Sequence, residues 1–274
     1  FQNTSALGIK PEDIGGTKLG ALGIPEFGTD FAMQMLMDTK PQYFSDLVRI
    51  AGLAHGTDVW LGNAQTLIKE GKATISTAIC TRDDIMIYLI QKGLDSEESF
   101  KIMEMVRKGK VASGKCKEWP EWKQDMIDHG VPDWYIWSCE RIKYMFPKAH
   151  AAAYVMMAWR VAYCKVFYPL AYYTAYFSIR ATAFDYEKMA MSPVRLEHYI
   201  AEYKAKKAEG TISNTEEDEL GVMRIVQEMH ARGYEFTPID IYKAKARTFQ
   251  IIDGKIMPSF KVISKVCLLY TSPS

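Results

Sequence analysis

The sequence predicts a mainly α-helical chain with one short β-hairpin near its C-terminal end. Two observations carry this prediction. Helix start and stop signals punctuate most of the chain, with a capping residue before an apolar run and a glycine after it. A single pair of short apolar runs, at residues 247–257, surrounds an Asp-Gly step, which is the pattern of a hairpin.

Three segments carry both a capping residue and a glycine stop. Thr81 and Asp84 fit a capping box, and Asp95 and Glu98 repeat the device ahead of the next apolar run. The three helices are expected between Thr81 and Gly93, between Asp95 and Gly109, and from the Ser-Asn-Thr cluster at 213–215 to Gly233. Residues 57–71 are also expected to be helical, whereas residues 1–29, rich in Gly and Pro, are expected to form loops with short helical turns.

Composition excludes several classes of protein. The chain has 274 residues, of which 48% are apolar and 24% charged, and its net charge is +1. These values argue against a disordered, collagenous or disulfide-stapled chain and against a uniformly basic nucleic-acid coat. The five cysteines form no C-x-x-C pair, so we expect no zinc site and a reduced, cytoplasmic setting.

No segment is expected to cross a membrane. The best apolar run, residues 166–179, has no charge but contains Pro169 and falls short of the roughly 18 residues that a span needs. The chain begins with Phe1 and has no signal peptide, so we expect it to be an internal piece of a longer protein.

Charge is unevenly distributed along the chain. Residues 101–165 carry 12 Lys and Arg against 7 Asp and Glu, whereas residues 181–220 carry 5 against 9. A nearly neutral total therefore combines a basic middle with an acidic stretch. We interpret the acidic stretch as a solvated helix pair with its linker.

The most informative segment is residues 144–154. Pro147 suits the first position of a helix, which would place Lys148 and His150 in the first turn beside unpaired N–H groups. A helix start of this kind attracts anions, phosphate above all. At about 100° per residue, His150, Tyr154 and Lys165 share one face, which could hold a triphosphate and stack on a base or sugar. The alternative is that His150 and Tyr154 simply pack in a core.

A second basic cluster lies at residues 107–110, where Gly109 follows Arg107 and Lys108 and precedes Lys110. A cationic turn flanked by glycine can follow a phosphate backbone. Alternatively, these cations complement the dipole of the preceding helix end. Arg82 stands in the first turn of a helix, where the dipole disfavours a cation, so we expect it to have an anionic partner, either external or in the adjacent aspartates.

Familiar catalytic motifs are absent from the sequence. It contains no phosphate-binding P-loop, no dinucleotide-binding glycine pattern, no H-E-x-x-H zinc motif and no G-x-S-x-G nucleophile motif. The adjacent acidic residues Asp83 and Asp84 are better explained as helix caps than as metal ligands. We therefore expect no metal site within the chain.

A series of motifs resembles the PolC-type DNA polymerase III alpha subunit, the replicative C-family polymerase of low-GC Gram-positive bacteria. The resemblance runs in order from about residue 5 to about residue 265. It is carried by residues 23–28 (GIPEFG), 44–49 (FSDLVR), 55–65 (HGTDVWLGNAQ), 82–86 (RDDIM), 105–110 (MVRKGK) and 144–154 (YMFPKAHAAAY).

The resemblance implies a fold and a division of the chain. Residues 1–232 would be the helical fingers region of the polymerase, and residues 233–266 would begin its duplex-DNA-binding region. Residues 267–274 depart from the family and are expected to be a non-native tail.

The resemblance also implies site residues. Lys148, His150 and Tyr154 match the segment that faces the nucleotide, and Arg82 and Arg107 are assigned to nucleotide contact as well. DNA contacts are assigned to four lysines, Lys108, Lys110, Lys143 and Lys165. Three further candidates in a matching motif, without an assigned contact, are His55, Asp58 and Asn63.

The expected function is that of a fragment of a DNA-directed DNA polymerase. In that family the catalytic aspartates and their Mg²⁺ ions belong to a palm domain that has no counterpart in this sequence, so the fragment alone is expected to be inactive. The implied partners are primer–template DNA, deoxynucleoside triphosphates and replisome subunits, including the sliding clamp through absent segments. Two alternatives from other classes are a non-catalytic helical nucleic-acid-binding module and a plain helical scaffold.

Overall fold

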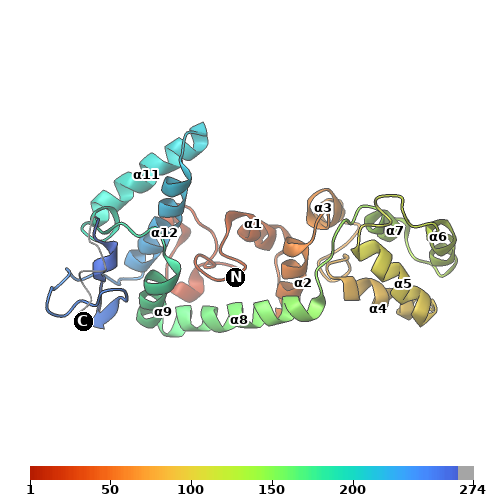
Figure 1. Ribbon diagram of the computed structural model, residues 1–274, viewed down its shortest axis with the longest axis horizontal. Helices are drawn as coiled ribbons and strands as arrows, with labels where there is room; N and C mark the ends of the chain where they lie inside the picture. The colour runs from red at the N-terminus through yellow and green to blue at the C-terminus, as the bar shows by residue number, and fades with distance from the viewer. Residues whose placement is uncertain (265–274) are drawn as a thin grey trace. The chain divides into compact units, whose positions relative to one another are not determined.

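A computed structural model describes residues 1–264 and confirms the predicted fold class. The described chain is mainly α-helical, with one two-stranded antiparallel hairpin near its C-terminal end (Figure 1). It divides into two compact units. Unit 1 contains residues 1–2 and 25–159, and unit 2 contains residues 3–24 and the chain from residue 160 onward. No helix within the described residues has both the length and the apolar character that a membrane crossing requires.

The predicted domain boundary after residue 232 does not coincide with the division into units. The predicted boundary separates two functional regions of a polymerase, whereas the two units are defined by how compactly the chain packs. The boundary therefore stays a prediction. The predicted non-native tail, residues 267–274, lies outside the described residues.

Unit 1 is built from helices that pack in sequence order. Its elements are α1 (Asp30–Thr39), α2 (Phe44–His55), a wide helical turn (Trp60–Ala64), α3 (Gln65–Lys69), α4 (Arg82–Gln91), α5 (Ser96–Arg107), α6 (Trp119–Asp128), α7 (Asp133–Cys139) and the first part of α8 (Lys148–Phe167). Helices α4 and α5 form the main packed pair. Their apolar faces are fully buried at Ile85, Leu89, Ile102 and Val106, which supplies the driving force for the pairing.

The predicted caps account for several helix starts. The backbone N–H of Thr81 donates to Asp84 Oδ2 at 2.8 Å at the start of α4. Asp95 accepts from two free N–H groups at the start of α5. At the start of α12 (Asn214–Ala231), Ser213 and Glu216 form a reciprocal capping box. These caps satisfy N–H groups that have no partner within the helix.

The prediction of a continuous helix over residues 57–71 is only partly correct. A regular helix covers Gln65–Lys69, whereas the turn at Trp60–Ala64 contains residues with non-helical backbone angles. Asn63 has φ −135° and ψ −105°, and it is buried with its side-chain amide donating to two backbone carbonyl groups. The bond to Asp58 O is local and competes with regular helix, as short amide side chains commonly do, whereas the bond to Ser138 O joins residues 75 positions apart.

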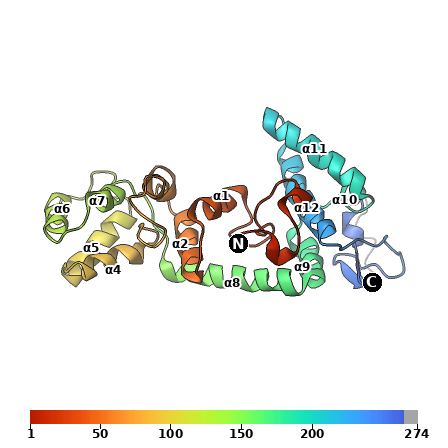
Figure 2. The same cartoon turned by 180° about the vertical axis from the view of Figure 1, so that it is seen from behind.

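Unit 2 combines helices with the hairpin. Its elements are two short 3₁₀ turns (Ser5–Leu7 and Pro11–Ile14), the rest of α8, α9 (Pro169–Ala175), a wide turn (Tyr176–Arg180), α10 (Tyr186–Met189), α11 (Pro193–Glu209), α12, β1 (Gln250–Ile252), β2 (Lys255–Met257) and a last 3₁₀ turn (Phe260–Val262). Helices α11 and α12 lie against each other as an antiparallel pair, which both views show (Figures 1 and 2).

The hairpin turns at the predicted Asp-Gly step. Ile251 pairs with Ile256, and the two residues of the connecting turn are Asp253, with φ 50°, and Gly254, with φ 76°. Positive φ at both positions is the signature of a type I′ turn, which matches the twist of the flanking strands. The Asp-Gly step was therefore a sufficient signal for this element.

Candidate functional site

The segment before α8 connects three other parts of unit 1. It is held in an extended path by backbone hydrogen bonds, each between 2.9 and 3.3 Å. These bonds run from Thr57 N–H to Tyr144, from Lys143 N–H to Thr57, from Met145 N–H to Arg107, and from Arg82 N–H to Phe146. The start of α8, the start of α4, the end of α5 and the loop after α2 therefore meet at one place. Most of the predicted site residues lie on these four elements.

Helix α8 begins at Lys148 rather than at Pro147, whose carbonyl accepts the first helical bond from Ala151 at 3.1 Å. The expectation that the first N–H groups are all free is wrong for the first of them. Lys148 N–H donates to Asp83 Oδ2 at 2.8 Å. The following N–H groups in this turn have no acceptor within the helix because of their position. The helix start is thus an anion site that the carboxylate of Asp83 already occupies in part.

The ammonium group of Lys148 lies beside a second carboxylate. Its Nζ is 3.2 Å from Asp84 Oδ1, and the lysine side chain keeps 41% of its surface exposed. Asp84 is held in place because its other oxygen caps α4. The expected anionic partner of Arg82 is also present, since Arg82 Nε lies 3.9 Å from Asp83 Oδ2. The two aspartates therefore act as caps and ion-pair partners.

An aromatic cluster continues from the helix start. The ring of Phe146 lies 4.8 Å from that of His55, 6.0 Å from that of His150 and 6.1 Å from that of Tyr154, measured between centroids. His150 is exposed and Tyr154 keeps 48% of its surface exposed. The alternative that His150 and Tyr154 pack in a core is therefore wrong, and their assignment to nucleotide contact stays a prediction. His55 Nε2 is fixed 2.5 Å from Glu26 Oε2.

Two members of this cluster were not predicted as site residues. Phe146 and Glu26 both lie inside motifs that carry the family resemblance. The available signal was the position of Phe146 directly before the proline that precedes the helix. Only the tertiary structure brings Glu26 to His55, because 29 residues separate them.

The basic turn after α5 carries less free charge than its sequence indicates. Arg107 donates from Nε and from a terminal nitrogen to the two carboxylate oxygens of Glu104, and Lys108 Nζ lies 2.8 Å from Glu104 Oε2. The hydrogen bonds from Arg107 lower the pKa of Glu104 to about 2. Two cations thus share one carboxylate, while Lys110 is exposed. One excess positive charge remains on the shared cluster, and Lys110 adds another.

Lys143 and the motif at residues 55–65 belong to the same region. Lys143 Nζ lies 2.8 Å from Asp58 Oδ2, and this hydrogen bond raises the pKa of Lys143. Asn63 is buried, and its amide donates to the carbonyl groups of Asp58 and Ser138 at 2.9 and 3.2 Å. Asn63 therefore holds the loop that carries Asp58 and is a structural residue.

Comparison with known proteins identifies the group to which this arrangement belongs. Residues 11–130 match the family model of the bacterial DNA polymerase III alpha subunit finger domain. The chain is 52% identical over 260 residues to the PolC-type DNA polymerase III of Streptococcus suis, and the match covers 95% of this chain. The resemblance to the PolC-type DNA polymerase III family is confirmed.

Two other PolC-type relatives agree with this assignment. The chain is 50% identical over 263 residues to the protein of Bacillus subtilis and 48% identical over 266 residues to that of Caldanaerobacter subterraneus subsp. tengcongensis. The chain spans only 18% of the length of each of these relatives. The finger-domain match includes Arg82 and Arg107 and ends before Lys148.

The prediction that Lys165 contacts DNA is wrong. Although α8 begins in unit 1, Lys165 belongs to unit 2 and is fully buried. Its ammonium group lies 2.8 Å from Gly20 O, 2.6 Å from Leu22 O and 2.8 Å from Glu228 Oε1. Burial lowers the pKa of Lys165, against the opposing attraction of Glu228. Helical periodicity predicts which residues share one face of a helix, but it does not predict which parts of the chain pack against that face.

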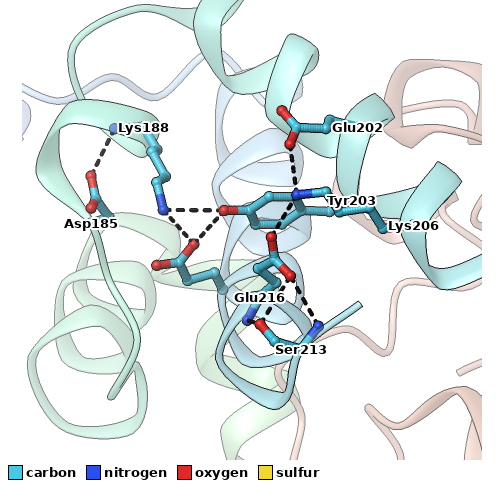
Figure 3. A network of polar contacts seen from close by, with 8 residues as sticks. Asp185, Lys188, Glu202, Tyr203, Lys206, Ser213 and Glu216 are labelled. Carbon is cyan, nitrogen blue, oxygen red and sulfur yellow. Dashed lines mark hydrogen bonds and ion pairs between the residues drawn. The ribbon is translucent and has the colours of Figure 1, made fainter. Parts of the chain in front are cut away.

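Part of the acidic stretch of unit 2 is paired with lysines of the same stretch, as Figure 3 shows. Lys188 Nζ lies 2.7 Å from Glu219 and 3.1 Å from the hydroxyl of Tyr203. Lys206 Nζ lies 2.9 Å from Glu202 and 2.7 Å from Glu216. These contacts join α10, α11 and α12. This stretch therefore contains a helix pair, as the sequence predicted, and ion pairs hold it together.

Proposed function

We propose that this chain is the fingers part of a replicative DNA polymerase and that the start of α8 positions the triphosphate of the incoming nucleotide. The whole enzyme would join the 3′ oxygen of a primer to the α-phosphorus of a deoxynucleoside triphosphate. The bond from that phosphorus to the bridging oxygen would break, and pyrophosphate would leave. The fingers would contribute positioning and charge neutralisation to this step.

The observation that carries the proposal is the composition of the α8 start. A half-exposed lysine ammonium, helix N–H groups, an exposed imidazole and an exposed phenol lie within about two turns of one helix. The cation and the N–H groups suit phosphate oxygens, and the ring of Tyr154 suits a sugar or a base. Arg82 adds a second cation beside the same helix start.

The aspartates at the site do not prevent phosphate binding by Lys148. An ion pair with an exposed partner contributes only about 0–1 kcal/mol, and the Lys148 side chain is 41% exposed. The lysine can therefore leave Asp84 for a phosphate at small cost. Charge-assisted hydrogen bonds to a triphosphate are worth about 1.5–3 kcal/mol each, so the exchange favours the nucleotide.

We place the catalytic carboxylates and the Mg²⁺ ions of this chemistry outside the chain. When bound, Mg²⁺ would stabilise the charge that develops on the phosphates. The described residues do not fit such a centre: no group of three or more potential metal ligands occurs among residues 1–264. Asp83 and Asp84 are already committed to caps and ion pairs. The fragment alone is accordingly proposed to be inactive.

The remaining assignments follow from the same proposal. Residues 233–264 would begin the region that holds primer–template duplex, and Lys108, Lys110 and Lys143 would contact DNA. The replisome subunits, including the sliding clamp, would bind through parts of the relatives that lie outside this chain. Bacterial chromosomal DNA lies in the cytoplasm, so the proposed activity places the protein there.

The test is Lys148→Ala in a full-length PolC-type polymerase that carries this segment. The expected result is a rise of about 10-fold or more in KM for all four nucleotides, with the Kd for primer–template DNA nearly unchanged. Lys101→Ala is the matched control, because Lys101 is exposed and paired with Glu97 at 2.7 Å on α5. It should leave both constants unchanged.

The two alternative functions give different results in the same experiment. A nucleic-acid-binding module would lose DNA affinity, with a reduced salt dependence and no effect on nucleotides. A plain scaffold would lose only stability. Either result would reject the proposed role of Lys148.

A further inference from the structure

A strained backbone position lies beside the candidate site. Among the described residues, four residues other than glycine have a left-handed backbone, namely Glu26, Lys40, Asp58 and Asp253. Lys40 ends α1 and Asp253 lies in the hairpin turn, so local turn geometry accounts for both. Glu26, with φ 69°, follows Pro25 in the turn before α1. Glycine is the usual residue where a turn needs positive φ after a proline, because a Cβ atom is crowded in this conformation.

The side chain of Glu26 explains why a glutamate stands at this position. Its Oε2 lies 2.5 Å from Nε2 of His55, and the glutamate side chain keeps only 20% of its surface exposed. An ionised carboxylate only accepts hydrogen bonds, so the imidazole donates from Nε2 and its orientation is fixed. Glycine at position 26 would lose this contact. Strained backbone of this kind is typical of functional sites, where the surrounding structure holds one side chain in a required place.

The backbone of His55 is fixed against the segment that leads into α8. His55 is the last residue of α2, and two residues later Thr57 forms an antiparallel bridge with Tyr144, with Thr57 N–H donating to Tyr144 O at 2.9 Å. A Cβ atom at Gly56 would lie 3.1 Å from the same carbonyl oxygen, which is tighter than usual. Glycine thus lets the two segments approach closely. Both the backbone and the imidazole of His55 are therefore held beside the start of α8.

The imidazole of His55 packs against two rings of the candidate site. Its centroid lies 4.8 Å from that of Phe146 and 6.1 Å from that of Tyr154, and Phe146 and Tyr154 are 6.1 Å apart. The three rings are tilted by 31–35° relative to one another. Tyr154 keeps 48% of its surface exposed, so these two neighbours restrict the rotamers that its ring can adopt. A contact at Glu26 is thus transmitted through His55 to Tyr154.

We propose that Glu26 and His55 are positioning residues for nucleotide binding, which hold the ring of Tyr154 in the orientation that receives the sugar or base. The inference rests on the proposed function, because that function assigns Tyr154 to the nucleotide. A ring that is already oriented loses less conformational entropy when a ligand binds to it. Since the pair acts through Tyr154 and not on the reacting phosphates, its loss weakens nucleotide binding and leaves the chemical step nearly unchanged.

The test is Glu26→Gly in a full-length PolC-type polymerase that carries this segment. Glycine removes the carboxylate but adopts the left-handed backbone without strain, so the variant should remain folded. We expect KM for all four nucleotides to rise about 3- to 10-fold, as the loss of one hydrogen bond implies, with kcat nearly unchanged. Glu26→Gln keeps a side-chain oxygen that accepts from His55, so its KM should stay near the wild-type value.

The matched control is Lys40→Gly, which relieves the same left-handed backbone at a residue outside the ring cluster and should leave KM unchanged. The combined variant Glu26→Gly and Tyr154→Ala tests the route of the effect. If Glu26 acts through Tyr154, the KM of the combined variant equals that of Tyr154→Ala alone. Circular dichroism should show that all variants are folded.

Four results would overturn the proposal. They are a wild-type KM for Glu26→Gly, an equal rise in KM for Glu26→Gln, an equal rise for Lys40→Gly, and effects of Glu26→Gly and Tyr154→Ala that multiply in the combined variant. Failure of the proposed function is distinguishable, because Lys148→Ala and Tyr154→Ala would then both keep the wild-type KM. A rise in KM for those two variants without one for Glu26→Gly rejects the positioning role alone.

Discussion

The buried ion pair of unit 2 leads to the most specific stability prediction for this chain. Replacing Lys165 with methionine keeps most of the side-chain volume and removes the ammonium group. Glu228 is then left buried with its charge uncompensated, because both residues are fully excluded from solvent. The carbonyl groups of Gly20 and Leu22 also lose their donor.

The expected loss of stability follows from these contacts. Removing one partner of a buried ion pair typically costs about 3–5 kcal/mol, since the remaining charge has no counterion. The hydroxyl of Tyr173 donates to Glu228 at 2.7 Å and Arg232 lies 3.2 Å from that hydroxyl, so the carboxylate keeps part of its solvation. We therefore expect about 3–5 kcal/mol rather than more. The double variant Lys165→Met and Glu228→Gln, which removes both charges, should lose less than the sum of the single variants.

The assay is urea unfolding of the chain followed by far-ultraviolet circular dichroism. Tryptophan fluorescence serves as a parallel probe that reports the unfolding of unit 1, because all six tryptophans lie in that unit. The control is Lys255→Met, whose lysine is 52% exposed and pairs with Glu235 at the surface. It should change the free energy of unfolding by about 0–1 kcal/mol. A Lys165→Met variant within about 1 kcal/mol of the wild type would refute the reasoning.

Two further predictions concern unit 1. Hydrogen bonds from Arg107 lower the pKa of Glu104 from 4.5 to about 2. The ionised Glu104 therefore stabilises the fold above pH 4.5, and this stabilisation is lost as the pH falls towards 2. Glu104→Gln should flatten the pH dependence of the urea midpoint in that window, and an unchanged profile would contradict the pairing. Gly109 has φ +69° and a Cβ there would lie 2.6 Å from the carbonyl oxygen of Lys143, so Gly109→Ala should destabilise the fold by about 2–4 kcal/mol in chemical unfolding. Gly114→Ala, with φ +68° but open space around it, should cost clearly less, and equal losses would reject the steric argument.

Local signals in the sequence were sufficient for the elements that depend on near neighbours. The caps at Asp95 and Ser213, the Asp84 half of the capping box at Thr81 and the Asp-Gly turn of the hairpin all act within a few residues, and each occurs as expected. The Thr81 hydroxyl itself makes no capping hydrogen bond. The turn at Trp60–Ala64 departs from the expected helix because the amide of Asn63 bonds to a carbonyl group 75 residues away. No periodicity of the local sequence encodes such a partner.

The candidate site shows the same difference between features that local sequence predicts and contacts that only the tertiary structure creates. The sequence identified the residues at the start of α8 and the basic turn at residues 107–110, because helix starts and cation runs are local features. It did not reveal that Asp83 occupies the first N–H of α8 or that Glu26 fixes His55, because each of these contacts joins residues far apart in the sequence. The pairing of Glu104 with Arg107 and Lys108 was also missed, although these residues stand at the i,i+3 and i,i+4 spacing of one helix.

The amino-acid sequence by itself determined the helical class of this protein, its caps and its hairpin, and it carried the motifs of its family. The tertiary structure decided which charges remain available to a ligand. Lys165 and Lys148 lie on one helix, yet the first is enclosed by two carbonyl groups and a glutamate while the second stays half exposed. Electrostatic availability depends on solvent and on distant counterions, and these are set by packing rather than by the order of residues.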